Sequence, residues 1–293
     1  FRTPFPGLNH RNELEKALRE ASAKKFTRQG GIISLLPSVF PGEEFIAAVG
    51  SVFGATFPSI GMYPHISRGR FTTLFNDEII SGALTGGFIG GTDLLIACGS
   101  THGFKPIGIP FQLQRVQNNR VLDLDDGKPA YHMYQYYFQD KIARLERDEE
   151  EASRFFSIYP LGFKMSDGEY AITVPEKVLV DGSLVVRGGI FTDRVVRLMF
   201  STPAITLDST KRLISRLKKR FKEIYFVFVV ESIHRLRILY PEAEKELAVI
   251  QDDVGQDVPV VGMVSDYHFS SSAEDLPGHH IINSGLTVMM CGV

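Results

Sequence analysis

The chain has 293 residues, of which 44% are apolar and 23% charged, and its formal net charge is −2. This length favours about two domains with a full apolar core. The near-neutral charge argues against a general nucleic-acid binder, because binding a polyanion usually needs a basic surface. Cys98 and Cys291 are the only cysteines, which excludes a disulfide scaffold and a zinc ribbon. No apolar run approaches the roughly 18 residues of a membrane span, so we expect a cytoplasmic protein.

The first part of the chain alternates helical and strand-like patterns. Apolar residues at helical spacing predict a helix over residues 9–26, and a Gly-Gly pair ends it. A buried strand is expected at 32–36, followed by a helix that begins at Pro41 and runs to Phe53. Further strands are predicted at 57–62, 70–75, 78–84 and 92–98. The polar, turn-rich residues 120–129 are typical of a domain boundary.

The second part repeats this alternation after a helix-rich stretch at 129–154. Strands are predicted at 159–163, 170–174, 184–186, 194–199, 225–230, 259–264 and 281–291. Helices are predicted at 209–222 and 242–250. Strands and helices that alternate in blocks indicate an α/β (mixed α+β) fold, with mixed sheets covered by helices.

One strand–helix–strand pattern occurs twice. The strand at 32–36 leads through a helix to Phe57-Pro58-Ser59-Ile60-Gly61-Met62, and the strand at 225–230 leads through a helix to Val258-Pro259-Val260-Val261-Gly262-Met263. Coincidence between two common units is the alternative. A duplication predicts two similar sheet-and-helix modules that share a strand order. Ligands favour the carboxyl ends of strands in such sheets, so the expected ligand-facing loops are 37–41, 63–67, 232–235 and 265–269.

The same segments carry a resemblance to a known family. The runs that carry it are His102-Gly103-Phe104-Lys105-Pro106-Ile107-Gly108, residues 118–121, residues 124–130 with Tyr134, residues 181–184, 188–190 and 226–228 with Arg235, and residues 259–263. From about residue 30 onward the chain resembles the FIST family of sensory domains, which have an N-terminal and a C-terminal module. The resemblance implies modules at 1–125 and 126–293. Because the chain begins at Phe1, we expect the first strand and helix of the first module to be missing.

The resemblance implies that a small ligand, with amino acids as the suggested class, binds between the two modules. It also implies coupling to a signalling protein partner. The sequence departs from the family where Ser232-Ile233-His234-Arg235 stands in place of Cys-x-x-Arg, and where Ser265-Asp266-Tyr267-His268 replaces a loop with a Gly-Glu pair. An activity that depends on a cysteine is therefore not expected.

Candidate ligand-binding residues lie in the expected loops. Arg235 follows a buried strand, and its guanidinium suits a ligand carboxylate. The alternative is a structural salt bridge with one of the acidic residues Glu231, Glu242 and Glu244. Asp266 or His268 would hold the opposite pole of the ligand, and Tyr267 would stack or donate a hydrogen bond. A plain surface loop is the alternative for these three residues.

Three further residues complete the candidate site. Ser232 and Tyr63 lie in the same predicted loops, and His102 ends a strand where it would line the wall. A Cys98–His102 nucleophilic pair is conceivable, but a buried, packed thiol is the favoured interpretation of Cys98. No familiar metal-ligand spacing is present, and the glycine run at 86–91 does not match a dinucleotide motif. We therefore expect no cofactor and no metal.

The basic residues between Lys211 and Lys222 suggest either an anionic partner or, as favoured here, a solvated helix face. The overall prediction is a sensory protein that binds a small carboxylate or amino acid. An enzyme acting on a similar molecule and an interaction scaffold with a vestigial pocket are the alternatives. Catalysis predicts converging acid–base groups with shifted pKa values, whereas a scaffold predicts a large exposed apolar patch.

Overall fold

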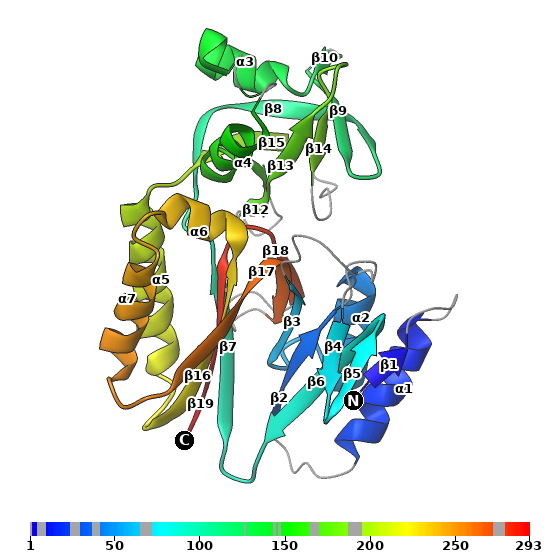
Figure 1. The fold of residues 1–293 in the computed structure, drawn as a ribbon, viewed down its shortest axis with the longest axis vertical. Coiled ribbons are helices and arrows are strands. Elements are labelled where there is room, and N and C mark those ends of the chain that lie inside the picture. Colours follow the sequence, from blue (N-terminus) through cyan, green and yellow to red (C-terminus); the bar gives the residue numbers. More distant parts are fainter. Residues whose placement is uncertain are drawn as a thin grey trace.

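The computed structural model describes residues 2–4, 10–23, 30–36, 42–64, 72–125, 127–142, 145, 148–164, 170–186, 195–271 and 279–293. Among these residues the strands form a nine-stranded sheet, an eight-stranded sheet and a two-stranded hairpin (Figure 1). The large sheet has the order β1 (Arg2–Pro4), β6 (Ala83–Gly90), β2 (Gly30–Leu35), β3 (Ser59–Pro64), β17 (Val260–Ser271), β16 (Ile224–Ser232), β19 (Leu286–Gly292) and β7 (Leu95–Thr101), with β18 (His279–Ile282) on β17.

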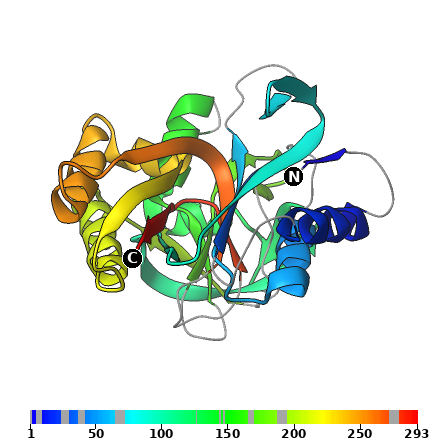
Figure 2. The same ribbon diagram turned by 90° about the horizontal axis from the view of Figure 1, so that it is seen from below.

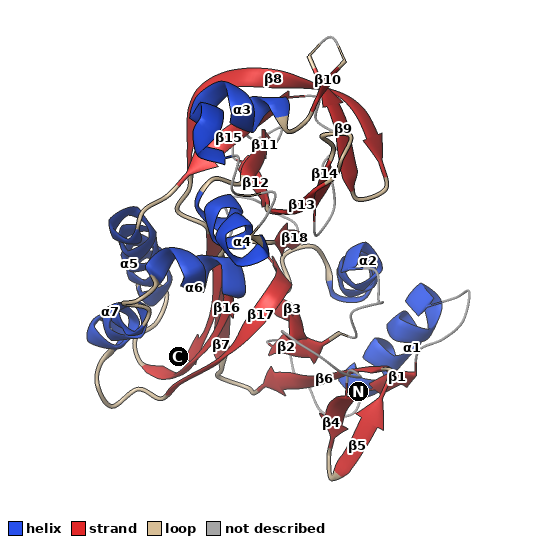
Figure 3. Ribbon diagram, turned by 45° about the horizontal axis from the view of Figure 1, so that its top comes forward, coloured by secondary structure: helices blue, strands red, loops and turns tan. Residues whose placement is uncertain are grey.

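The eight-stranded sheet is antiparallel throughout. Its order is β12 (Tyr170–Thr173), β11 (Leu161–Lys164), β15 (Val195–Phe200), β8 (Lys105–Gln117), β9 (Arg120–Leu124), β14 (Leu184–Val186) and β13 (Pro175–Val178), with β10 (Lys128–Pro129) on β9. The hairpin consists of β4 (Thr72–Phe75) and β5 (Glu78–Ser81). Figure 3 shows the eight-stranded sheet beyond the end of the larger one.

The helices cover both sheets. They are α1 (His10–Ser22), α2 (Gly42–Phe53), α3 (His132–Phe138), the short η1 (Gln139–Ile142), α4 (Glu149–Ile158), α5 (Pro203–Lys218), α6 (Ile233–Leu239) and α7 (Glu244–Val254). Seen from below, α1 and α2 flank one side of the large sheet and α5 and α7 flank the other (Figure 2). Leu14, Leu18 and Phe45 are fully buried on the first side, and Leu213, Ile214 and Ile250 are buried on the second.

The predicted repeat is visible in the large sheet. In the first half β2 and β3 are parallel and β6 is antiparallel to β2. In the second half β16 and β17 are parallel and β19 is antiparallel to β16. The shared strand order confirms the predicted mixed α/β fold with repeated modules. The two units nevertheless share one sheet, because β3 and β17 pair antiparallel at its centre.

The large sheet is curled. Residues 91–94 join β6 to β7, although these strands lie near opposite ends of the strand order. A Cβ added to Gly31 on β2 would lie 3.1 Å from Ile96 on β7 and 3.3 Å from Met289 on β19. The two wings therefore face one another across an apolar core, which includes Met62 and Val230. A sheet that curls in this way buries both faces of its central strands.

Several element bounds differ from the sequence prediction. Helix α5 begins at Pro203 instead of residue 209, because Thr202 caps it and proline suits its first turn. Strand β17 continues to Ser271 instead of ending at 264, because β3 pairs with its second half. Strand β8 was not predicted, since prolines, glycines and exposed polar residues interrupt its pattern. The division of modules at residue 125 stays a prediction.

Candidate functional site

The ends of three strands meet in the large sheet. Strand β16 ends at Ser232, which pairs with Ser265 of β17, and β3 ends at Pro64, which pairs with the same residue from the other side. The Ser232 N–H donates to the Gly285 carbonyl. Leu286, which follows Gly285 and begins β19, pairs with Thr101 at the end of β7. The carboxyl ends of β3, β7 and β16 therefore lie at one level. Residues 37–41 and 65–67 of the predicted loops lie outside the described residues.

Asp266 lies at an irregularity in β17. The pairing with β3 shifts register between Ser265 and Tyr267, which is the pattern of a β-bulge. Asp266 and Tyr267 are partly exposed, and the Tyr267 ring lies 4.1 Å from that of the buried Tyr63. Bulges redirect side chains and are frequent beside active sites. The prediction of a loop here was wrong, because these residues continue a paired strand.

Arg235 is fully buried in the first turn of α6. The segment was predicted to be a loop, but Ser232 caps a helix there by accepting the His234 N–H. The guanidinium forms an ion pair with Glu246 of α7, with Nη2 2.7 Å from Oε1 and Nε 3.1 Å from the same oxygen. Arg235 therefore does form a structural salt bridge, which was the alternative to ligand contact. Its partner is Glu246 and none of the three predicted glutamates, because the turn after α6 brings α7 back over Arg235.

The Arg235 side chain joins several elements. Its Nη2 donates to the Thr206 carbonyl at 2.9 Å and to Thr210 Oγ1 at 2.6 Å, both on α5. Its Nη1 donates to the His102 carbonyl at 3.0 Å, just beyond β7. Thr210 also donates to Glu246. Helices α5, α6 and α7 and the segment after β7 are thus held together at one buried cation, which gives Arg235 a positioning role whether or not a ligand is bound.

The carboxyl groups of Glu231, which is partly buried, and Glu246, which is fully buried, lie together beside Arg235. Burial raises the pKa of Glu231 to about 9, and a hydrogen bond to Glu246 and the charge of Glu246 add to the effect. Burial opposes ionisation of Glu246, but the charge and hydrogen bonds of Arg235 outweigh it and hold the pKa of Glu246 below its ordinary value. At neutral pH Glu231 is therefore protonated and donates to the ionised Glu246. Within the described residues Glu231 Oε1 has no hydrogen-bond partner.

Both predicted histidines are neutral at physiological pH. Burial, helped by the charge of Arg235, lowers the pKa of His102 to about 4 and that of His268 to about 3. His102 Nδ1 accepts the Phe104 N–H at 2.9 Å. His268 is fully buried, with Nδ1 3.1 Å from Ser265 Oγ and Nε2 2.8 Å from Thr287 Oγ1. His268 therefore belongs to an internal hydrogen-bond network.

Sequence reasoning missed several polar residues of this region. Thr287 extends the His268 network to Ser100, with their hydroxyl oxygens 2.7 Å apart. Asn283 and Ser284 form the turn before β19, and the Asn283 carbonyl accepts from Ser232 Oγ at 2.8 Å. A polar Asn-Ser-Gly run before an apolar strand was the available signal. Cys98 is buried in the sheet core, as its favoured interpretation predicted.

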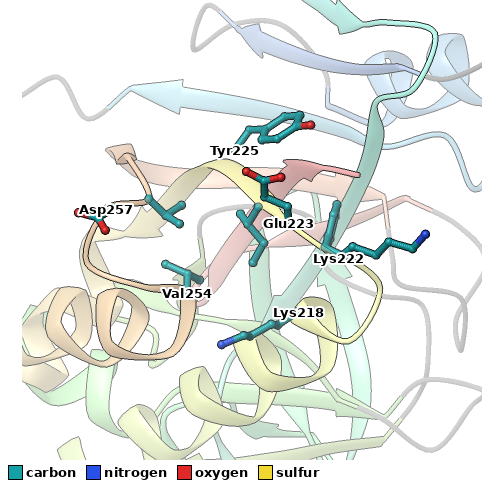
Figure 4. Close-up of a pocket in the computed structure, with 9 residues that line it drawn as sticks. Lys218, Lys222, Glu223, Tyr225, Val254 and Asp257 are labelled. Atoms are coloured by element: carbon teal, nitrogen blue, oxygen red, sulfur yellow. The ribbon is translucent and has the colours of Figure 1, made fainter.

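A surface pocket lies away from this cluster. It has a volume of about 510 Å³ and lies at the amino ends of β16 and β17, beside the last turns of α5 and α7 (Figure 4). Charged residues of both signs line it, including Lys218, Glu223 and Asp257. Strand β16 separates it from Ser232. The pocket is therefore separate from the residues around Ser232, Arg235, Asp266 and His268, which we call the strand-end cluster. The bulge at Asp266 and the convergence of polar side chains favour the strand-end cluster as the candidate site.

Comparison with known proteins adds family information. Residues 7–127 match the family model of the FIST N domain, and residues 130–266 match that of the FIST C domain. A search among curated proteins finds no significant match. In the part of the chain that the structure describes, no helix has the length and apolar character needed to cross a membrane.

Proposed function

Because the chain belongs to the FIST family, with an N and a C domain in tandem, we propose that it senses a small ligand, an amino acid or a related carboxylate, where the carboxyl ends of β3, β7 and β16 meet. One observation carries the proposal. The bulge at Asp266 lies in β17, the strand of the second unit that pairs with β3 of the first, and the carboxyl ends of strands from both units meet beside it. Ligands favour such strand ends in α/β sheets.

The candidate residues divide by exposure in this proposal. Asp266 and Tyr267 are partly exposed, so we assign them direct contact with the ligand, and the partly exposed His102 lines the site. Tyr63 is buried and supports the Tyr267 ring. Ser232, Arg235 and His268 are fully buried and hydrogen-bonded, so we assign them positioning roles. The described contacts leave one Nη1 hydrogen of Arg235 over, but the side chain is fully buried, so we assign Arg235 no direct contact with the ligand.

A thermal-shift screen of amino acids and small carboxylates tests the proposal. At 100 times its Kd a ligand adds about 2.7 kcal/mol, which corresponds to roughly 5–10 °C in Tm for a chain of this size. We expect Asp266→Asn and Tyr267→Ala to reduce the shift while the free protein stays folded. The matched control is Asp93→Asn, an exposed aspartate in the turn between β6 and β7. A shift that survives both site variants, or no shift across the panel, would contradict the proposal.

Turnover of the ligand is the second candidate function. The observation that favours it is the gathering of groups with shifted pKa values, His102, His268 and Glu231, around Arg235. His268 is fully buried, which counts against direct proton transfer from this residue to a substrate. Product analysis by mass spectrometry after incubation with each ligand found in the screen separates the two candidates, because a sensor returns its ligand unchanged.

A further inference from the structure

The first half of β17 is paired on one side only. Residues 260–264 pair with β16, but pairing with β3 on the other side begins at Ser265. Among the described residues no strand pairs with this second side of residues 260–264. Seen from below, this half of β17 is the outermost strand of its wing (Figure 2). We call residues 260–264 the open edge.

The backbone of the open edge carries unused hydrogen-bonding groups. The Pro259 carbonyl accepts from the Val227 N–H of β16 at 2.9 Å. Backbone groups along a strand turn alternately to its two sides, so Pro259 and every second residue after it face β16. The outward N–H and C=O groups are those of Val260, Gly262 and Val264. No strand pairing among the described residues uses them, and such a row is a template for one further strand.

The side chains of the open edge are apolar and exposed. Val261 is 53% exposed and Met263 is 38% exposed. They pair with Phe228 and Val230 of β16, which contribute to the apolar core between the two wings. Natural proteins often shield an edge with charged side chains, but residues 258–265 contain none. The open edge therefore extends the apolar face of the core into solvent.

Two features restrict what can cover the open edge. Outward N–H and C=O groups at alternate residues match an extended backbone, because a strand presents its own groups at the same spacing. The edge is also short, since Pro64 of β3 pairs with Ser265 and continues the same side. In a two-fold pairing of two copies, β3 of each copy would meet the turn at residues 255–259 of the other. A second copy therefore fits poorly, whereas a free extended segment fits.

We propose that the open edge of β17 binds an extended apolar segment of a partner protein as an added strand. Hydrogen bonds to the outward backbone groups of Val260, Gly262 and Val264 hold the segment. Its alternate apolar side chains cover Val261 and Met263, which gives the contact its specificity. This surface does not depend on the small-ligand proposal, so either can fail without the other.

Peptide selection on the full chain tests the added strand. A phage library of random decapeptides is panned on the wild type, and the selected sequences are synthesised with a fluorescent label for polarisation titrations. We expect peptides with apolar residues at alternate positions. Methylating every second backbone nitrogen removes the donors on one side of a strand. We therefore expect one of the two alternating methylation patterns to weaken binding at least tenfold, and the other to weaken it far less.

Two variants place a charge on the open edge. Val261→Lys and Met263→Lys should each weaken peptide binding at least tenfold while the Tm of the free protein is retained, because both positions are exposed. The matched control is Ile79→Lys, since Ile79 is 76% exposed and lies in the separate β4–β5 hairpin. If either edge variant unfolds, the two methylation patterns on the wild type decide the question.

Three results overturn the proposal. The first is a selection that yields no binding peptide. The second is equal binding to the wild type and both folded edge variants, or equal effects of the two methylation patterns. The third is a dimer in sedimentation equilibrium that Met263→Lys dissociates, because it would assign the open edge to a second copy of the chain. None of these results bears on the thermal-shift test of the small ligand.

Discussion

Replacing Arg235 by methionine is the most informative single perturbation of this fold. Methionine keeps much of the volume of the side chain and removes its charge and its donors. Glu246, which is 2% exposed, then loses the cation that stabilises its ionised form, and the His102 and Thr206 carbonyls lose a donor. Removing one partner of a buried ion pair typically costs about 3–5 kcal/mol. We expect the free energy of unfolding to fall by this amount at pH 7.

A second variant separates the charge from the packing. In Arg235→Met with Glu246→Leu no buried charge is left unpaired, and replacing a whole buried pair by apolar residues is often neutral. We expect the double variant to be more stable than Arg235→Met alone. Some loss should remain, because Thr210 and the two carbonyls still lack the partner that Arg235 provided.

Urea unfolding followed by far-ultraviolet circular dichroism measures these differences, since the chain has no tryptophan for fluorescence. Arg235 lowers the pKa of Glu246, so the ion pair stabilises the protein above the ordinary carboxyl pKa, and that stability is lost as pH falls through the lowered value. The gap between wild type and Arg235→Met should therefore narrow from pH 7 to pH 4. A gap below 1 kcal/mol at pH 7, or one that widens in acid, would refute the reasoning.

Three further predictions follow from single residues. His268 has a lowered pKa, so the wild type should lose stability relative to His268→Gln as pH falls from 6.5, by up to about 1.4 kcal/mol per unit in urea titrations. Glu231 has a raised pKa, so stability that is present below pH 4.5 is lost as pH rises toward 9, and Glu231→Gln should gain on the wild type in melts at pH 8 compared with pH 5. A Cβ at Gly262 would lie 2.5 Å from the Val229 carbonyl oxygen, so Gly262→Ala should destabilise the protein by about 1–3 kcal/mol. Gly50 on α2 has open space around it, so Gly50→Ala should stabilise the protein by up to about 1 kcal/mol. Melting curves that rank the two variants in the opposite order would contradict this packing argument.

The candidate site was only partly predictable from the sequence. Residues 232 and 265–268 were singled out because they follow buried strands, and pairing does bring Ser232 and Ser265 together. The capped helix that contains Arg235 was missed, because a seven-residue helix has too few turns to show a period. Glu246 was missed as the partner, since a solvated helix face and a buried glutamate look alike in a charged segment.

The family, the mixed α/β class and the repeated strand–helix–strand unit could all be predicted from the amino-acid sequence. These features depend on local patterns: helical and strand periods, and the Pro-x-apolar-Gly-Met run that occurs in both halves. The pairing of β3 with β17, which joins the two units into one curled sheet, and the packing of Arg235 against Glu246 are visible only in the folded chain. Strand pairing and buried charge compensation are contacts between distant parts of the chain. Their energies depend on three-dimensional neighbours that no local pattern encodes.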